Sequence, residues 1–226
     1  MQFLHIMERR IVVATLLLGW AAGVRGQQTA SPLSADQALA RLLAGNARYV
    51  AYQEKHPDES PARRRELTSS QHPFAVVLGC SDSRVAPELL FDEGLGDLFV
   101  IRVAGNIVDD AVLGSIEYAV EHLGTKLIVV LGHEKCGAVT AAVESDKGTG
   151  HLSALVAAIR PAVLAAASSP GDKIHNCVIE NVRRVARQIR ESEPVLKEAS
   201  QKSGVKVIAA DYELDTGKVR LLDSHP

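Results

Sequence analysis

The sequence predicts an α/β fold: a mostly parallel central β-sheet flanked by helices, forming a single domain with an N-terminal helical arm. Three short apolar runs, at 74–78, 98–103 and 127–131, have the composition of strands buried on both faces of a parallel sheet. Between the second and third runs, 109–122 carries apolar residues at helical spacing, which indicates a βαβ unit. The length of 226 residues suits one such domain.

The N-terminal segment has the layout of an export signal. Arg9 and Arg10 precede an apolar stretch at 11–24, and small residues follow up to Gly26, where cleavage is expected. The stretch is shorter than the roughly 20 residues that cross a membrane, although an uncleaved anchor stays open as an alternative, as does twin-arginine export. We therefore expect an exported protein, periplasmic or secreted and free of the membrane after cleavage. It would consist of a signal peptide (1–26), a tether (27–33) and a folded domain (34–226).

Helical patterns flank the predicted strands. Ser34 and Gln37 form a capping box ahead of an amphipathic stretch. Two further helices are expected at 152–167 and 174–190, and Cys177 in the second falls where a small apolar residue would be buried. The runs 205–210 and 219–222, joined across Asp215-Thr216-Gly217, predict a C-terminal hairpin.

The charge balance gives no reason to expect a nucleic-acid partner. The formal net charge is -2, and loss of the signal would make it two units more negative. No basic stretch interleaved with aromatic residues is present, which a nucleic-acid-binding surface would favour.

Two short motifs carry the chemistry, and both lie where a predicted strand ends. CSDSR (80–84) follows the first apolar run, and HEKC (133–136) follows the third. Ligand sites of open α/β sheets collect at the carboxyl ends of strands, and a turn of helix starting after Gly132 would place the imidazole and the thiol of the second motif on one face. Two thiols, an imidazole and a carboxylate suit zinc. A disulfide between the two motifs is the alternative, but it would leave the histidine and the aspartate unexplained.

Taken together, the two motifs resemble the signature of the β-class carbonic anhydrases, in their plant-like branch. The likeness extends through LFVIRVAGN (98–106) and EYAVEHL (117–123), and it covers the chain from Ser34 to its end. The resemblance implies a zinc ion, Zn2+, with three protein ligands, a catalytic pair beside it and a substrate pocket. The implied ligands are Cys80, His133 and Cys136, the catalytic pair is Asp82 and Arg84, and the pocket residues are Gln71, Phe99, Tyr118 and Gly137.

The same resemblance implies zinc-dependent, reversible hydration of carbon dioxide to bicarbonate and a proton. Asp82 would either close the site as a fourth zinc ligand or pair with Arg84, which keeps it off the metal. The family also implies a homodimer or a dimer of dimers. Two alternatives stay open: hydrolysis of carbon disulfide or carbonyl sulfide on the same fold, and a non-catalytic module that senses bicarbonate through a closed zinc site.

Overall fold

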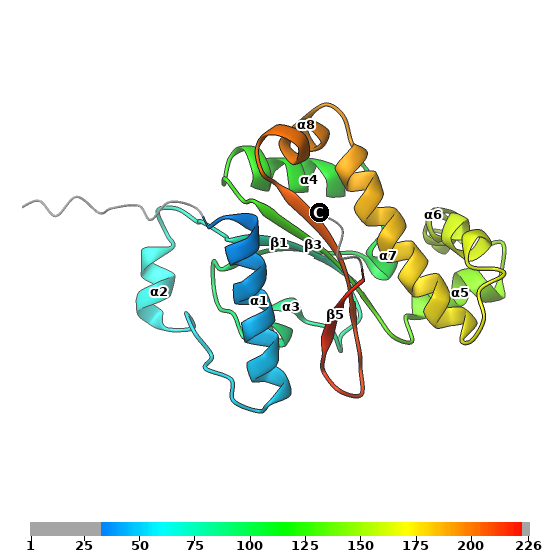
Figure 1. The fold of residues 1–226 in the computed structure, drawn as a ribbon, viewed down its shortest axis with the longest axis horizontal. Helices are drawn as coiled ribbons and strands as arrows, with labels where there is room; N and C mark the ends of the chain where they lie inside the picture. The colour runs from blue at the N-terminus through cyan, green and yellow to red at the C-terminus, as the bar shows by residue number, and fades with distance from the viewer. Residues whose placement is uncertain (1–32, 223–226) are drawn as a thin grey trace, which may run out of the picture. The chain divides into compact units, whose positions relative to one another are not determined.

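A computed structural model describes residues 33–222, which form a five-stranded sheet with helices on both faces (Figure 1). The strand order is β2-β1-β3-β4-β5; the first four strands in this order are parallel, and β5 is antiparallel to β4. This arrangement confirms the predicted fold class. The strands are β1 (Ala75–Gly79), β2 (Leu98–Arg102), β3 (Leu127–His133), β4 (Lys206–Tyr212) and β5 (Val219–Leu221). The predicted signal peptide, and the predicted tether except for Leu33, lie outside the described residues.

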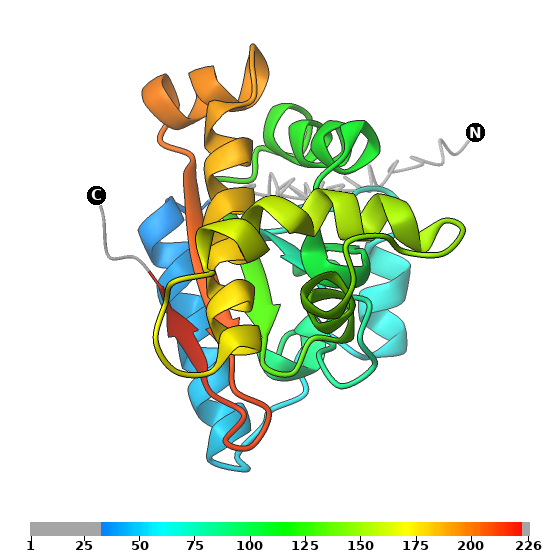
Figure 2. The ribbon, with the colours of Figure 1, turned by 90° about the vertical axis from the view of Figure 1, so that its right-hand side faces the viewer.

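The helices connect and cover these strands. They are α1 (Ala35–Val50), α2 (Pro61–Glu66), α3 (Pro87–Leu90), α4 (Asp110–Glu121), α5 (Gly137–Glu144), α6 (Leu152–Ala165), α7 (Lys173–Glu191) and α8 (Val195–Lys202), with one 3-10 helix, η1 (Ala104–Asn106). Helix α1 lies on one face of the sheet and α7 on the other (Figures 1 and 2). No helix among the described residues combines the length and the apolar composition that a membrane span requires.

Helix α1 begins at the predicted capping box. The Ser34 hydroxyl accepts a hydrogen bond from the Gln37 amide at 3.3 Å, and the Gln37 side chain accepts one from the Ser34 amide at 2.9 Å. The two reciprocal bonds satisfy amides that the first helical turn leaves unpaired. The predicted helical arm is therefore confirmed as an element, and it packs its Ala38 and Leu42 side chains into the core.

The predicted βαβ unit is β2-α4-β3, with β1 lying between its two strands in the sheet. Strands β1 and β3 are buried along their whole length, as expected for central strands of a parallel sheet. The same expectation is wrong for β2, whose residues are half-buried or exposed. Among the described residues β2 has a neighbouring strand on one side only, so its position at the sheet edge explains the difference.

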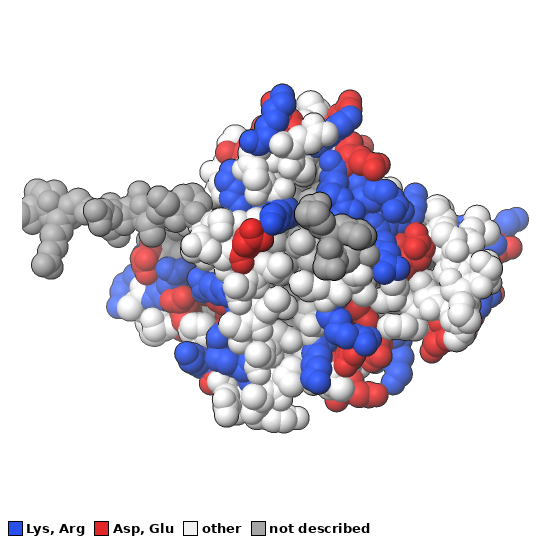
Figure 3. Space-filling model, in the orientation of Figure 1, with Lys and Arg blue, Asp and Glu red and all other residues white. Residues whose placement is uncertain are grey.

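Helix α7 covers the other face of the sheet with a continuous apolar stripe. Cys177 in this stripe is fully buried, as predicted, and Val178 and Val182 occupy the space that a Cβ at Gly132 would need. Basic side chains gather over α7 in Figure 3, in agreement with the four arginines that its sequence carries between positions 183 and 190. The C-terminal hairpin is also confirmed, as β4 and β5.

The parallel register decides which strand ends meet. Gly79, the last residue of β1, lies beside Leu131 of β3 on one side and Arg102 of β2 on the other. Cys80 follows β1 directly, and His133 ends β3. The two predicted motifs are therefore brought to the same edge of the sheet, as expected for the carboxyl ends of parallel strands.

Candidate metal centre

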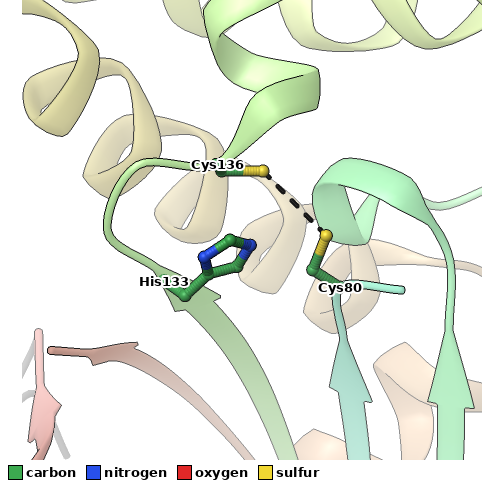
Figure 4. Close-up of side chains that lie close together, drawn as sticks. All are labelled: Cys80, His133 and Cys136. Carbon is green, nitrogen blue, oxygen red and sulfur yellow. Dashed lines mark hydrogen bonds between the residues drawn. The ribbon is translucent and has the colours of Figure 1, made fainter. Parts of the chain in front are cut away.

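Cys80, His133 and Cys136 form a compact group of ligand atoms at this edge (Figure 4). Their ligand atoms all lie within 4.8 Å of one another, and the two Sγ atoms are 4.0 Å apart. Two thiolates bound to one tetrahedral zinc at about 2.3 Å would be separated by about 3.8 Å. The three residues have exposures of 4%, 1% and 2%, so water is largely excluded from them. This donor set and its spacing fit zinc.

The ring of His133 is oriented by its own backbone neighbour. Its Nδ1 lies 2.8 Å from the carbonyl oxygen of Glu134, so that nitrogen carries the proton and donates it to the carbonyl. The Nε2 atom is buried without a hydrogen-bond partner. Metal-bound histidines commonly use one nitrogen for the metal and donate the other N–H to such a carbonyl. The orphaned Nε2 is therefore available as a metal ligand.

The predicted helical turn between His133 and Cys136 is wrong. His133 still belongs to β3, where it pairs with Tyr212 of β4, and Cys136 occupies the N-cap position that precedes α5. Between them Lys135 adopts a left-handed conformation, with φ of 53°, which no helix could include. Strand pairing with β4 has overridden the local helical spacing, and a tight turn brings the thiol back toward the imidazole.

Backbone amides surround the two sulfurs. The Gly105 N–H donates to Cys80 Sγ at 3.3 Å, and the amides of Ala138 and Val139, in the first turn of α5, face the Cys136 thiol. The hydrogen bond with Cys136 lowers the pKa of Cys80, while the same pairing raises the pKa of Cys136. At 4.0 Å the sulfurs are about twice a disulfide bond length apart, and all three cysteines are free thiols. The structure therefore does not contain the alternative disulfide.

Asp82 and Arg84 form a bidentate ion pair beside the three ligands. The Arg84 Nε and a terminal nitrogen donate to the two carboxylate oxygens at 2.9 and 2.7 Å. The Arg84 side chain holds the pKa of Asp82 well below its usual range, so the carboxyl group is ionised. Its Oδ2 lies 3.9 Å from the Nε2 atom of His133. The carboxylate is thus adjacent to the ligand group while its charge is already paired with arginine.

Arg102 fixes the loop that carries both Cys80 and Asp82. Its Nε donates to the Cys80 carbonyl at 2.8 Å, and a terminal nitrogen donates to the Asp82 carbonyl. Because Arg102 ends β2 directly beside Gly79, the guanidinium reaches these carbonyls without leaving the sheet edge. The backbone of the first motif is therefore clamped at two points.

Comparison with known proteins agrees with this geometry. The family model described as carbonic anhydrase matches residues 75–219, which contain both motifs. The chain is 40% identical to a carbonic anhydrase of Mycolicibacterium smegmatis over 195 residues, covering 84% of this chain and 93% of that protein. It is 39% identical to carbonic anhydrase 2 of Mycobacterium tuberculosis over 197 residues, covering 85% and 94%. The chain belongs to the carbonic anhydrase family.

Solved structures place it in the β-class. One of the two tetrameric β-carbonic anhydrases of Sordaria macrospora superposes with a TM-score of 0.67 at 26% identity, covering 81% of this chain and 96% of that one. The β-carbonic anhydrase CafA of Aspergillus fumigatus gives a TM-score of 0.67 at 30% identity, covering 83% and 92%. The fold of this β-carbonic anhydrase thus indicates the same class as its two sequence motifs.

Three of the four predicted pocket residues lie away from the metal centre of their own chain. Gln71 precedes β1 whereas Cys80 follows it, and the five intervening strand residues span about 16 Å. Gln71 lines a surface hollow that contains none of the three ligands. Phe99 pairs with Val76 near the start of β1, and its ring packs against Tyr118 with centroids 6.2 Å apart. Within one chain these residues therefore do not complete the site.

Gly137, the fourth predicted pocket residue, lies at the centre itself. It follows Cys136 directly and begins α5, and a Cβ added there would meet no atom within 4 Å. The absence of a side chain leaves open space next to Cys136, one of the three candidate ligands. Its predicted role in substrate binding is compatible with this position and stays a prediction.

Three residues that support the centre had no predicted role: Arg102, Gly105 and Asn181. Arg102 and Gly105 lie in the stretch that carried the family resemblance, so that resemblance was the available signal. The sequence signal for Asn181 was weaker. Asn181 is a polar residue within the apolar stripe of α7, where a buried amide needs a partner.

Proposed function

We propose that this β-carbonic anhydrase catalyses the reversible hydration of carbon dioxide to bicarbonate and a proton, using zinc held by Cys80, His133 and Cys136. The observation that carries the proposal is the buried group of two thiols and an unpartnered imidazole nitrogen, with an arginine-paired carboxylate at 3.9 Å. Zinc at such a site supplies Lewis acidity, which lowers the pKa of water toward about 7 and makes hydroxide available near neutral pH.

The residues around the ligands have distinct tasks in this reaction. Asp82 is ionised and accepts two side-chain hydrogen bonds from Arg84, so its oxygens can also accept a hydrogen bond from the attacking hydroxyl group. Such a bond orients the nucleophile toward the carbon of the substrate. Arg84 keeps Asp82 in this position and stops it from becoming a fourth ligand. Gly137 leaves room for the substrate beside Cys136.

The test is to measure zinc content and carbon dioxide hydration on the same purified sample. We expect one zinc per chain, loss of hydration on removal of zinc with a chelator, and recovery when zinc is returned. Hydration that persists unchanged in metal-free protein would contradict the proposal. A zinc-loaded protein that is inactive at every pH would instead favour the sensing module.

Substrate preference is tested in the same experiment. Carbon disulfide and carbonyl sulfide differ from carbon dioxide in size and polarity, and the same three ligands could serve their hydrolysis. We expect hydration of carbon dioxide to be the faster reaction in parallel turnover assays. Faster turnover of either sulfur compound would transfer the assignment to that substrate.

We also propose that the chain assembles as a homodimer or a dimer of dimers. Support comes from Gln71, Phe99 and Tyr118, whose predicted pocket role requires a second subunit because they lie far from their own metal centre. The similar protein of Sordaria macrospora is tetrameric. Sedimentation at micromolar concentration should show a dimer or tetramer, and a purely monomeric active enzyme would contradict both the assembly and these pocket roles.

Export is proposed from residues 1–26 alone. The basic pair, the apolar stretch and the small residues before Gln27 support an N-terminal signal and a periplasmic or secreted enzyme. Expression of the full chain in a bacterium, followed by fractionation and N-terminal sequencing, should find a protein that begins near Gln27 outside the cytoplasm. An intact N-terminus on cytoplasmic protein would contradict export.

A further inference from the structure

Two consecutive hydrogen bonds connect helix α7 to the metal ligand Cys80. The side-chain amide of Asn181 donates to the Gly105 carbonyl at 2.9 Å, and the Gly105 N–H donates to Cys80 Sγ at 3.3 Å. Asn181 and Gly105 are both buried. The Asn181 side chain therefore holds a residue whose backbone amide donates to the Cys80 sulfur.

Gly105 depends on such an anchor because its backbone is unusual. It has φ of 73° in the middle of η1, a left-handed conformation that interrupts the helix. A Cβ at this position would lie 2.7 Å from Ile159 Cδ1 and 3.2 Å from Ala138 Cβ, so α6 and α5 close over the residue on that side. These apolar contacts limit where Gly105 can move, but they do not orient its peptide groups. The peptide that follows Gly105 is held by two hydrogen bonds, one from the Asn106 N–H to the Val103 carbonyl at 2.8 Å and one from the Asn181 side chain to the Gly105 carbonyl at 2.9 Å.

The position of Asn181 on α7 has a stability cost. Its residue exposure is 1%, and its Oδ1 atom has no hydrogen-bond partner. A buried amide oxygen without a partner destabilises the fold, and an apolar side chain would suit the neighbouring Val178 and Val182 better. A role for its N–H group in the site would account for a polar residue here.

We propose that Asn181 is a positioning residue for the metal centre: it holds the Gly105 carbonyl so that the Gly105 N–H stays aimed at the Cys80 thiolate. This inference rests on the zinc-dependent function proposed above. A hydrogen bond to a thiolate ligand stabilises charge on the sulfur and fixes its orientation, and partners of this kind typically change metal affinity 10–100-fold. Asn181 thus acts on the metal through Gly105 and Cys80 and touches neither metal nor substrate.

The experiment compares Asn181→Leu with a matched control on the same helix, Val185→Ala. Leucine has the same number and branching of side-chain heavy atoms as asparagine, although its two methyl groups are bulkier, and it cannot donate to the Gly105 carbonyl. Val185 is equally buried one turn further along α7, and its truncation weakens the packing of this helix while Asn181 stays intact. Asn181→Ala serves as a second variant should the leucine protein fail to fold. Zinc affinity is measured by chelator competition, and the cobalt-substituted proteins give the sulfur-to-cobalt charge-transfer band.

We expect both Asn181 variants to bind zinc about 10–100-fold more weakly than wild type. The charge-transfer band should move to longer wavelength, because a sulfur that loses a hydrogen bond holds its electrons less tightly. Val185→Ala should lower the melting temperature but leave affinity and band close to wild type. The inference is overturned if the Asn181 variants keep wild-type affinity and band, or if Val185→Ala changes both equally. Neither readout uses carbon dioxide, so an inactive but zinc-binding wild type would refute only the proposed function.

Discussion

Arg84 holds Asp82 at three points, through two guanidinium nitrogens and its own backbone amide at 3.0 Å. The carboxylate so held lies 3.9 Å from the ring nitrogen of His133 that faces the metal site. An ionised carboxylate this close to a zinc site has two competing partners, the guanidinium and the metal. In this structure it is paired with the guanidinium, whose side chain is 51% exposed and therefore easily replaced by mutation without a packing defect.

Replacing Arg84 with alanine should release Asp82 to ligate zinc. We expect turnover to fall by about 100-fold or more, the usual contribution of a positioned acid–base group, while zinc content stays near that of wild type. Hydration rate and metal content must be measured on the same sample, with Arg184→Ala, a surface arginine of α7, as control. Loss of zinc together with activity would mean that Arg84 supports the site structurally, and retention of activity would remove its proposed role.

The cysteines should separate into ligands and packing residues. Cys136→Ser is expected to lose both zinc and activity, because a serine hydroxyl does not replace a thiolate ligand. Cys177→Ser should keep zinc near the wild-type content, since Cys177 is buried in α7 and lies outside the ligand group. Elemental analysis of the two purified variants decides the point. Metal loss in the Cys177 variant would overturn the ligand assignment.

Asp92 should stabilise the fold at neutral pH and lose this effect in acid. Burial acts to raise its pKa, but hydrogen bonds from Arg48 and from the amides of Lys55 and His56 outweigh burial and lower it. Its folded-state pKa is therefore below the unfolded value, so the stabilisation is complete above the unfolded pKa and disappears as the pH falls through the folded one. Asp92→Asn should lower the free energy of unfolding by about 1–3 kcal/mol at pH 7.

The pH dependence of the difference in unfolding free energy between Asp92→Asn and wild type tests this prediction. Denaturant unfolding of Asp92→Asn and wild type should give a difference that shrinks below about pH 4, where the Asp92 carboxyl of the unfolded wild-type chain begins to protonate. A difference that stays constant, or grows, in acid would show that the negative charge of Asp92 is not what stabilises the segment around Lys55.

Asp211, in contrast to Asp92, should destabilise the fold at neutral and alkaline pH. It is fully buried on β4, and within the described structure neither carboxylate oxygen has a hydrogen-bond partner. Burial raises the pKa of Asp211 in the folded protein above its value in the unfolded chain. The ionised carboxylate therefore destabilises the fold at any pH above the folded-state pKa. This destabilisation disappears as the pH falls from the folded-state pKa to the unfolded-state pKa. Asp211→Asn is therefore expected to raise the melting temperature at pH 8 by more than at pH 5. An equal gain at both pH values would mean that shape, and not charge, is responsible.

The local features of this protein could be predicted from its sequence. The capping pair Ser34 and Gln37 predicted the start of α1, and the apolar runs predicted β1 and β3, because these signals depend on neighbours within a few residues. It also predicted that the motifs beginning at Cys80 and ending at Cys136 would meet, since parallel strands bring their carboxyl ends to one edge. Family resemblance then supplied the expected roles.

The distant groups that support those motifs depend on strand order and helix packing. Strand order placed β2 at the edge, and its register brought Arg102 to the Cys80 carbonyl. Pairing with β4 kept His133 in a strand, where spacing alone had predicted a helix. The packing of α7 over the sheet brought Asn181 to Gly105, a contact across 76 positions of sequence. Hydrophobic periodicity records which side of an element is buried but not which partner covers it, so these contacts could not be predicted from the sequence.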